Sequence, residues 1–115
     1  SYRTEGMIIA PCSIKTLAGV ANCFSDNLIS RAADVCLKEG RKVGLMVRET
    51  PLHQGHLELK AKAVQFGCLI MPPVPAFYHR PANINDIINQ TVGRALDQFG
   101  IETDIVHRWK DTNTK

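Results

Sequence analysis

Three short apolar runs divide the chain into segments. They cover residues 7–10, 43–47 and 68–71, and none of them alternates with polar positions. Apolar runs of this length without alternation are typical of parallel strands that are buried on both faces. The sequence therefore predicts three parallel strands that are separated by helical segments.

The segment between the first two predicted strands carries two sets of helix signals. Ser13 can cap a first helix that continues through Asn22. Ser25 can start a second helix, and Gly40 can end it. One side of this second predicted helix is apolar and consists of Leu28, Ile29, Ala32, Ala33 and Cys36.

Two more helices are predicted in the second half of the chain. One covers residues 53–66 and ends at Gly67, and Asn83 can cap the other. The apolar positions of the last helix form one continuous stripe of Ile84, Ile87, Ile88, Val92, Ala95, Leu96 and Phe99. Arg94 falls at the edge of this stripe, so it can reach a cleft.

The order of these elements predicts an α/β fold with a parallel sheet. Three strands are few for such a sheet, which is normally covered on both faces. The chain opens directly into its first strand at Gly6, and neither a GxGxxG nor a GxxxxGK motif occurs. We therefore expect the latter part of a larger doubly wound domain.

Composition and charge narrow the classes of ligand. The chain has 115 residues, of which 44% are hydrophobic and 22% charged, as in ordinary globular domains. The net charge of +3 comes without a long basic run, which suits an anionic small ligand. Aromatic residues make up only 6%, and no RNA-binding motif or zinc-finger spacing is present, which argues against nucleic acid as a partner.

The cysteines and the apolar runs indicate the compartment. Four cysteines occur without a CxxC pair, and we find no secretory leader, so we expect reduced thiols in the cytoplasm. No apolar run approaches the roughly 20 residues that a membrane-spanning helix needs. We therefore expect no membrane span.

Polar groups that suit a phosphate follow the first predicted strand. The stretch of Ser13, Ile14, Lys15 and Thr16 offers free backbone N–H groups, two hydroxyls and an ammonium at a helix start. Such a helix start, at the carboxyl end of a sheet, is a common phosphate-binding site. A helix cap with a surface lysine is an equally simple interpretation of the same residues.

Arg48 and Glu49 come directly after the second predicted strand, at the same edge of the sheet. An arginine there can hold an anion, and a partly desolvated carboxyl can exchange a proton with a leaving group or a ring. A solvated turn that Pro51 closes is the alternative.

The loop after the third predicted strand contains four prolines, which stiffen it and orient Tyr78. The hydroxyl of Tyr78 can donate to a phosphate oxygen, although an aromatic pair of Phe77 and Tyr78 in such a loop is often structural. Polar groups at three consecutive strand ends favour a shared site more than any one of them does.

Two further sets of residues have a structural and a functional interpretation. Arg31 and Lys38 are seven residues apart on one helix face, with Asp34 between them. This pattern predicts a salt-bridged surface stripe or, alternatively, a basic wall that faces a phosphate in a neighbouring subunit.

His53 and His56 form an HxxH pair without a third ligand nearby, so solvated or capping histidines are favoured over a metal site. No Asp-rich cluster is present to hold a metal on a diphosphate, which predicts metal-free chemistry.

Five strings of the sequence together resemble the UbiX/phenylacrylic acid decarboxylase family. They are GMIIAPCSIKTLAGVA, SRAADVCLKEGRK, RETPLH, MPPVPAFYHRP and INDIINQTVGRALDQFGI, and they cover nearly the whole chain. The resemblance implies a Rossmann-like (flavodoxin-like) three-layer sandwich, of which residues 1–115 are the C-terminal part and residues 102–115 the tail. Compared with the family, this sequence lacks the N-terminal Gly-Ser-Gly loop. The difference is roughly 70–80 residues, or two βα units.

The same resemblance implies an FMN-binding flavin prenyltransferase. Such an enzyme joins dimethylallyl monophosphate to reduced FMN, and the prenylated FMN serves a UbiD-type decarboxylase, for example in ubiquinone biosynthesis. The resemblance also implies a homo-oligomer, usually a dodecamer, with sites shared between subunits. An FMN carrier without chemistry and a direct aromatic acid decarboxylase are the alternative functions.

The family's site residues carry over by motif. Ser13, Ile14, Lys15, Thr16 and Arg48 would contact FMN. Tyr78, Arg94 and Lys38 would hold the prenyl phosphate, and Arg31 matches a further basic position near the site. Glu49 would be the acid/base residue, and Arg48 and Lys38 would be catalytic together with it. Trp109 of the tail would cover the pocket or, alternatively, only dock the tail onto the domain.

Overall fold

The computed structural model describes residues 5–78 and 80–101 of the chain. These residues fall into two compact units, Ser1–Pro73 and Val74–Lys115. Each unit has its own elements and is described by itself. Trp109 lies outside the described residues.

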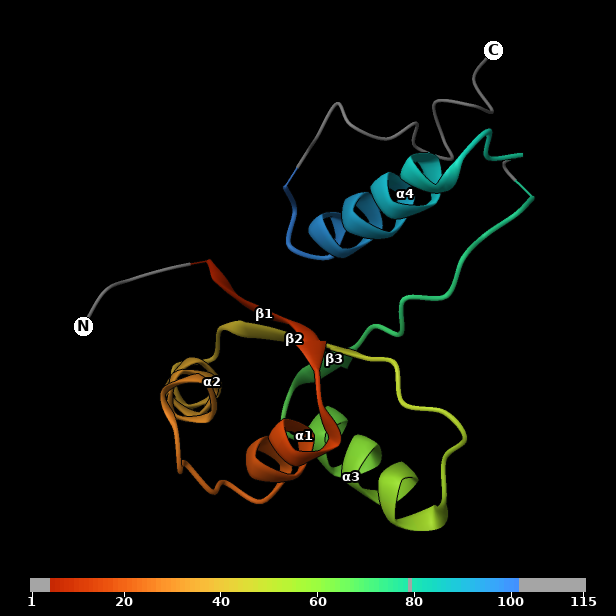
Figure 1. Ribbon diagram of the computed structural model, residues 1–115. Coiled ribbons are helices and arrows are strands. Elements are labelled where there is room, and N and C mark those ends of the chain that lie inside the picture. Colours follow the sequence, from red (N-terminus) through yellow and green to blue (C-terminus); the bar gives the residue numbers. More distant parts are fainter. Residues whose placement is uncertain (1–4, 79, 102–115) are drawn as a thin grey trace. The chain divides into compact units, whose positions relative to one another are not determined.

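The first unit contains a sheet of three parallel strands. β1 (Gly6–Cys12), β2 (Lys42–Val47) and β3 (Cys68–Ile70) lie in the order β1-β2-β3 (Figure 1). All three strands coincide with the apolar runs of the sequence, so the prediction of three parallel strands is confirmed. β1 is longer than its apolar run because it continues through Pro11 to Cys12.

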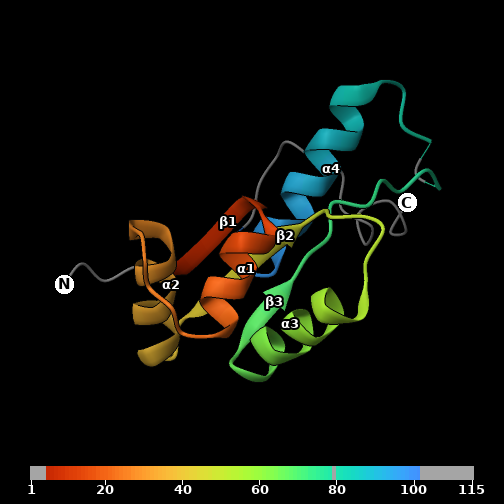
Figure 2. The same ribbon diagram turned by 60° about the horizontal axis from the view of Figure 1, so that its bottom comes forward.

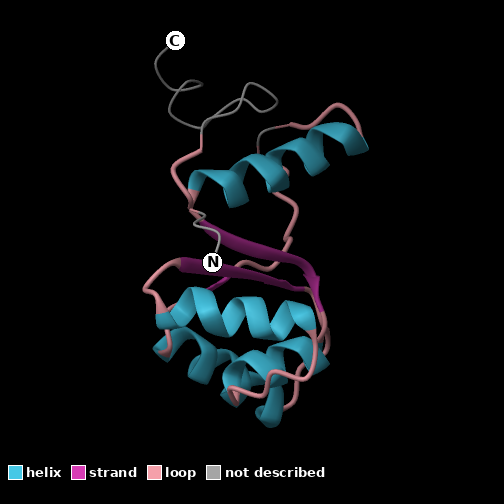
Figure 3. Ribbon diagram, turned by 90° about the vertical axis from the view of Figure 1, so that its left-hand side faces the viewer, coloured by secondary structure: helices cyan, strands magenta, loops and turns pink. Residues whose placement is uncertain are grey.

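Three helices of the first unit lie on the same face of this sheet, as Figure 3 shows. They are α1 (Ile14–Ala21), α2 (Leu28–Lys38) and α3 (Gln54–Gln65). The chain crosses from β1 to β2 and from β2 to β3 in one direction, and right-handed crossovers in one direction place their helices on one side. The unit therefore has two of the three layers expected from the sequence.

The core of the first unit lies between the sheet and these helices. Val43, Leu45 and Val47 alternate along β2 and are fully or almost fully buried, with Leu17 of α1 and Ala63 of α3 packed into the same cluster. The residues between them on the strands turn to the other face, where Ile8, Met46 and Leu69 are half-buried. No helix of the described part of this unit covers that second face.

The start of α2 differs from the sequence prediction. The helix is capped by Asn27 and not by Ser25, because the side chain of Asn27 accepts a hydrogen bond of 2.9 Å from the backbone N–H of Ser30. The hydroxyl of Ser30 accepts in return from the backbone N–H of Asn27 at 3.4 Å, which completes a capping box. The end is as predicted, since Gly40 follows the last turn with a φ of 73°.

The apolar side of α2 is also shifted from the prediction. Ser30, Ala33 and Cys36 form the buried face of the helix, whereas Leu28 is 81% and Ile29 49% exposed. Small side chains at the buried positions allow the helix backbone to approach the sheet closely. The larger apolar residues of the first turn are left outside this contact.

The second unit contains α4 (Ile84–Asp97), with Asn83 as its cap as predicted. The side chain of Asn83 accepts from the backbone N–H of Asp86 at 3.0 Å, and the carboxylate of Asp86 accepts from the backbone N–H of Ala82 at 2.8 Å. Within the described residues Gly93 and Ala95 are the buried residues of this helix. No helix in the described parts of the chain is long and apolar enough to span a bilayer.

Replacement of Leu45 by alanine is expected to lower the free energy of unfolding by roughly 2–5 kcal/mol, because its side chain is fully buried in the core cluster. Leu57→Ala is the matched control, since Leu57 of α3 is 53% exposed and its loss should cost no more than about 0.5 kcal/mol. Urea unfolding followed by circular dichroism measures both. Equal losses in the two variants would contradict the position of the core.

The thiols should differ strongly in reactivity with alkylating reagents. Burial raises the pKa of the Cys12 and Cys68 thiols to about 11, and proximity of the two thiols adds to the effect at Cys12. Near pH 8 only roughly one thousandth of either thiol would be the reactive thiolate. We expect iodoacetamide to modify the exposed Cys23 first and the buried pair only at higher pH or after unfolding in urea, as mass spectrometry of peptides would show. Fast labelling of Cys12 in the folded protein would contradict this.

Candidate functional site

The register of β1 and β2 brings two predicted site residues side by side. Cys12 of β1 pairs with Val47 of β2, and these are the last residues of the two strands. Ser13 and Arg48 are the next residues along the chain, so they lie next to each other at the carboxyl edge of the sheet. Figure 2 shows β1 and β2 leading to this edge, with α1 beginning at the end of β1.

Ser13 forms the cap of α1. Its hydroxyl oxygen accepts a hydrogen bond of 3.1 Å from the backbone N–H of Thr16 and donates to the hydroxyl oxygen of Thr16 at 3.1 Å. The first N–H groups of a helix have no partner within the helix, and Ser13 satisfies only that of Thr16. The N–H groups of Ile14 and Lys15 therefore remain available to an anion. The helix cap expected from the sequence is confirmed. The anion-binding role stays a prediction, which a capping serine does not exclude.

Arg48 and Glu49 begin the segment between β2 and α3, in which residues 48–53 form neither helix nor strand. Both side chains are exposed, and neither makes a hydrogen bond or ion pair recorded for the described residues. They are therefore free to contact a ligand. The desolvation that an acid/base role of Glu49 requires does not come from the described residues of this chain.

Lys38 lies at the opposite edge of the sheet from Arg48. It is the last residue of α2, shortly before β2 begins, whereas Arg48 follows the end of β2. The six residues of β2 span about 20 Å at roughly 3.3 Å per residue. One copy of the chain thus does not bring Lys38 together with Ser13 and Arg48.

The basic stripe of α2 is not salt-bridged in the described structure. Arg31, Asp34 and Lys38 are exposed, and no ion pair joins Asp34 to either basic residue among residues 5–78 and 80–101. The recorded ion pair of the described residues joins Arg41 to Glu39. The prediction of a salt-bridged stripe is therefore wrong, and the two basic side chains of α2 face solvent.

Tyr78 and Arg94 belong to the second unit. Residues 71–77 form no helix or strand, as the four prolines predicted, and the backbone N–H of Arg80 closes a turn onto the carbonyl oxygen of Phe77 at 2.9 Å. Tyr78 is 66% exposed at this turn. Arg94 lies in the last turn of α4 and is also exposed. Both side chains are thus accessible to an anion within their own unit.

The two histidines of the sequence motif cap α3. His53 is its cap residue, and His56 follows in the first turn. Among the described residues no three His, Cys, Asp or Glu side chains are grouped as metal ligands. The sequence favoured solvated or capping histidines over a metal site, and the structure shows that the two histidines cap the helix.

Comparison with known proteins gives the chain a family. The Flavoprotein family profile matches residues 1–95. The chain is 61% identical over 109 residues to the flavin prenyltransferase UbiX of Thauera aromatica and 58% identical over 112 residues to that of Escherichia coli K12. These matches include 95% and 96% of this chain but only 56% and 59% of the two relatives, so the chain spans a little over half their length.

Solved structures agree with the sequence comparison. AnUbiX (PadA1), solved in complex with FMN and dimethylallyl pyrophosphate, superposes with a TM-score of 0.92 at 50% identity, over 95% of this chain and 58% of that one. A dodecameric FMN-dependent UbiX-like decarboxylase of Escherichia coli O157:H7 superposes with a TM-score of 0.88 at 50% identity, over 93% of this chain and 58% of that one. The α/β fold expected from the sequence is thereby confirmed.

Proposed function

We propose a function on the following premise: the chain belongs to the Flavoprotein family and, within it, to the UbiX flavin prenyltransferases. The protein would join a dimethylallyl group to reduced FMN, with residues 1–115 supplying the C-terminal part of one flavoprotein domain. The names of the relatives, and the ligands of AnUbiX, support this activity.

The observation that carries the proposal is the adjacency of Ser13 and Arg48 at the carboxyl edge of the sheet. The N-terminus of α1 lies there, with the backbone N–H groups of Ile14 and Lys15 available. Beside it is Arg48, which forms no ion pair with the described residues. Donors of this kind bind phosphate esters, and FMN carries one. The residues present therefore fit the phosphate of FMN, with Ser13, Ile14, Lys15, Thr16 and Arg48 as its contacts.

Stabilisation of negative charge is the main task of the remaining residues. Reduced FMN supplies the nucleophile, and dimethylallyl monophosphate supplies the allylic carbon and the phosphate that leaves. Charge builds up on the departing phosphate, and Tyr78, Arg94 and Lys38 would hold it together with Arg48. Each preorganised donor can lower such a barrier by about 3–4 kcal/mol.

Glu49 would move the protons of the reaction. It follows Arg48 at the edge of the sheet and has no recorded partner among the described residues. In our proposal it gives a proton to the departing phosphate and later accepts one, so that a single group serves both directions. The exposure of Glu49 means that a covering segment must exclude water around it, and Trp109 of the tail is our candidate.

The position of Lys38 favours a site that is shared between copies of the chain. Lys38 and Arg48 of one copy lie at opposite ends of the strands, and Arg31 and Lys38 of α2 are exposed and form no ion pair with the described residues. We propose that these basic side chains complete the phosphate site of a neighbouring subunit. The dodecameric relative makes a dodecamer our preferred assembly.

The wider role follows from the same family. We propose that the prenylated FMN passes to a UbiD-type decarboxylase, as in ubiquinone biosynthesis. A cytoplasmic location fits the four cysteines, which are free thiols. A carrier that binds FMN without chemistry and a direct decarboxylase are the competing functions, and the decarboxylase name of the Escherichia coli O157:H7 structure favours the second over the first.

Reduced FMN mixed anaerobically with the protein and dimethylallyl monophosphate should gain the mass of one prenyl group, whereas Glu49→Gln should bind FMN normally and form the product at least about 100-fold more slowly. Mass spectrometry of the flavin measures both, and a parallel reaction with the diphosphate ester tests the donor. FMN bound with no mass gain would favour the carrier, and carbon dioxide released from an aromatic acid without a partner would favour the decarboxylase. Unchanged turnover in Glu49→Gln would remove this residue from the mechanism.

Mixed oligomers test whether the site is shared. Lys38→Ala and Arg48→Ala should each be inactive alone, because each variant lacks one of the two phosphate contacts at every site. Copies of the two variants that are unfolded together and refolded should recover part of the activity, since some sites then receive Lys38 from one copy and Arg48 from another. If the mixture stays as inactive as its components while wild-type protein survives the same treatment, Lys38 does not act across subunits.

A further inference from the structure

Two histidines close the start of α3 onto each other. The Nδ1 atom of His53 accepts a hydrogen bond of 3.4 Å from the backbone N–H of His56, and Nδ1 of His56 accepts one of 3.4 Å from the backbone N–H of His53. Their rings are stacked, with centroids 3.6 Å apart and planes inclined by 26°. The arrangement is a capping box in which imidazoles stand where hydroxyl, amide or carboxylate groups are usual.

Gly55 is part of the same arrangement. A Cβ atom at this position would lie 2.8 Å from Cε1 and 3.1 Å from Nδ1 of His53. The ring of His53 therefore lies against the backbone of residue 55, and a side chain at that position would displace the ring. The motif His-Gln-Gly-His thus encodes the cap as a unit.

Protonation of either ring would break this cap. A neutral imidazole can accept at one nitrogen, but a protonated one donates at both, so the hydrogen bond to its Nδ1 atom is lost. The added positive charge would also lie at the positive end of the helix dipole and against the second ring. These three effects act in the same direction, and histidines in general change their charge between pH 5 and 8.

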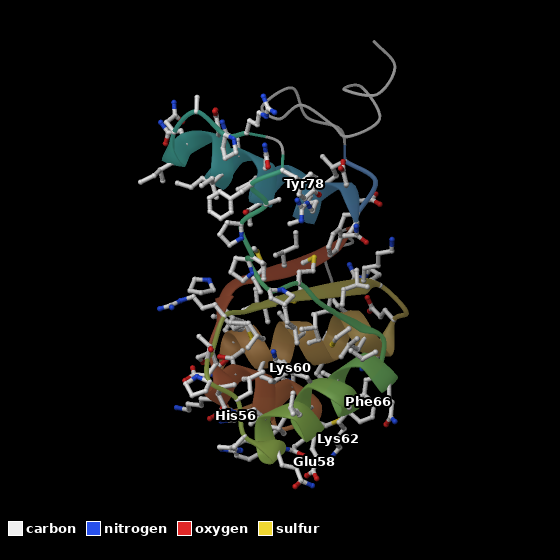
Figure 4. The ribbon with its side chains drawn as sticks, turned by 90° about the vertical axis from the view of Figure 1, so that its right-hand side faces the viewer. His56, Glu58, Lys60, Lys62, Phe66 and Tyr78 are labelled. Carbon is white, nitrogen blue, oxygen red and sulfur yellow. The ribbon has the colours of Figure 1, made fainter. Side chains whose placement is uncertain are left out.

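Few other charges surround the pair. Of the elements packed against α3, α1 carries Lys15 and β3 only the buried thiol of Cys68. Along α3 itself follow Glu58, Lys60 and Lys62, as Figure 4 shows. Glu58 accepts from the Gln54 side chain at 3.0 Å, and the ammonium of Lys62 donates to the Asn22 side chain at 2.8 Å. Among the described residues no carboxylate forms an ion pair with either imidazole, so none stabilises its protonated form.

The other described helices begin differently. α1, α2 and α4 are capped by Ser13, Asn27 and Asn83, whose side chains do not change their charge with pH. α3 is also the helix that follows the segment of Arg48 and Glu49. That segment is fixed at one end by the last pair of the sheet and at the other by the histidine cap.

We propose that His53 and His56 are positioning residues whose neutral rings hold the start of α3, and with it Arg48 and Glu49, in place, and whose protonation releases both. What Arg48 and Glu49 do there rests on the proposed function. The cap itself does not, so it can be tested without any turnover.

Hydrogen exchange of the α3 amides, measured by NMR near pH 7.5 and pH 5.5, tests the cap directly. After correction for the intrinsic pH dependence of exchange, we expect protection of the amides of residues 56–58 to fall roughly fivefold or more at the lower pH, as for loss of a helix cap. The amide of Asp86, which the Asn83 side chain caps at 3.0 Å, is the internal control and should keep its protection. Protection in α3 that does not change between the two values would overturn the proposal.

The double variant His53→Asn/His56→Gln is the matched control, because asparagine and glutamine can form the same box without titrating. Its α3 amides should keep their protection at both pH values, and an equal loss in this variant would refute a role of the histidines. Gly55→Ala provides a second test that retains both histidines. Alanine favours a helix in general, so low protection at both pH values would show that the ring of His53 needs the space at residue 55. Protection of α3 in Gly55→Ala that equals the wild type at both pH values would contradict the geometry.

The pH profile of prenyl transfer gives the functional result. Between pH 7.5 and pH 5.5 we expect kcat/KM of the wild type to fall roughly threefold or more beyond that of the double variant, because only the wild type releases Arg48 and Glu49. Absence of prenyl transfer in both proteins would reject the proposed function and leave the exchange results standing. Identical profiles in two active proteins would show that the cap does not position the site.

Discussion

The parallel pairing of β1 with β2 is the constraint on which the rest of the described site depends. Val43, Leu45 and Val47 fill the core on one face, and a shift of the register by one residue would turn them away from the helices. Between the pairs Ile9–Leu45 and Cys12–Val47, β1 has one residue more than β2. This bulge contains Pro11, which has no N–H group to offer the ladder. Both strands therefore end together, and the residues that follow them meet at one edge.

The apolar runs of the sequence were sufficient to predict the strands, and capping and stop residues predicted most helix ends. Uninterrupted apolar runs specify a buried parallel strand almost alone, and Ser13, Gly67 and Asn83 act through the backbone next to them. Prediction failed where two local signals compete. Ser25 and Asn27 can both cap a helix, and only the reciprocal bond of Ser30 decides for Asn27.

The candidate site was only partly predictable, because helical spacing does not tell how far apart residues of different elements lie in the fold. Spacing places Arg31 and Lys38 on one helix face, but the crossover from α2 into β2 places Lys38 at the edge away from Arg48. Helical periodicity does not contain that information, whereas the order of strands and helices does. Side-chain pairing between Asp34 and its basic neighbours was inferred from spacing alone, and exposed ion pairs gain too little energy for spacing to ensure them.

Exposure of the site residues sets a condition for chemistry. Ser13, Arg48, Glu49 and Tyr78 are all open to water in the described chain, and water competes with each contact that they could make to a phosphate. Preorganised charges are most effective where solvent is excluded. In our proposal the site therefore requires cover from residues beyond those described or from other copies of the chain.

The outer edge of β1 has a consequence for handling the protein. In the described sheet β1 pairs with another strand on one side only, so its other side is an edge of that sheet, next to the half-buried Ile8. Open edges of this kind recruit any extended polypeptide of suitable register, including a misfolded copy of the same chain. Low protein concentration during purification, and co-expression with a polypeptide that pairs with this edge of β1, would limit aggregation through it.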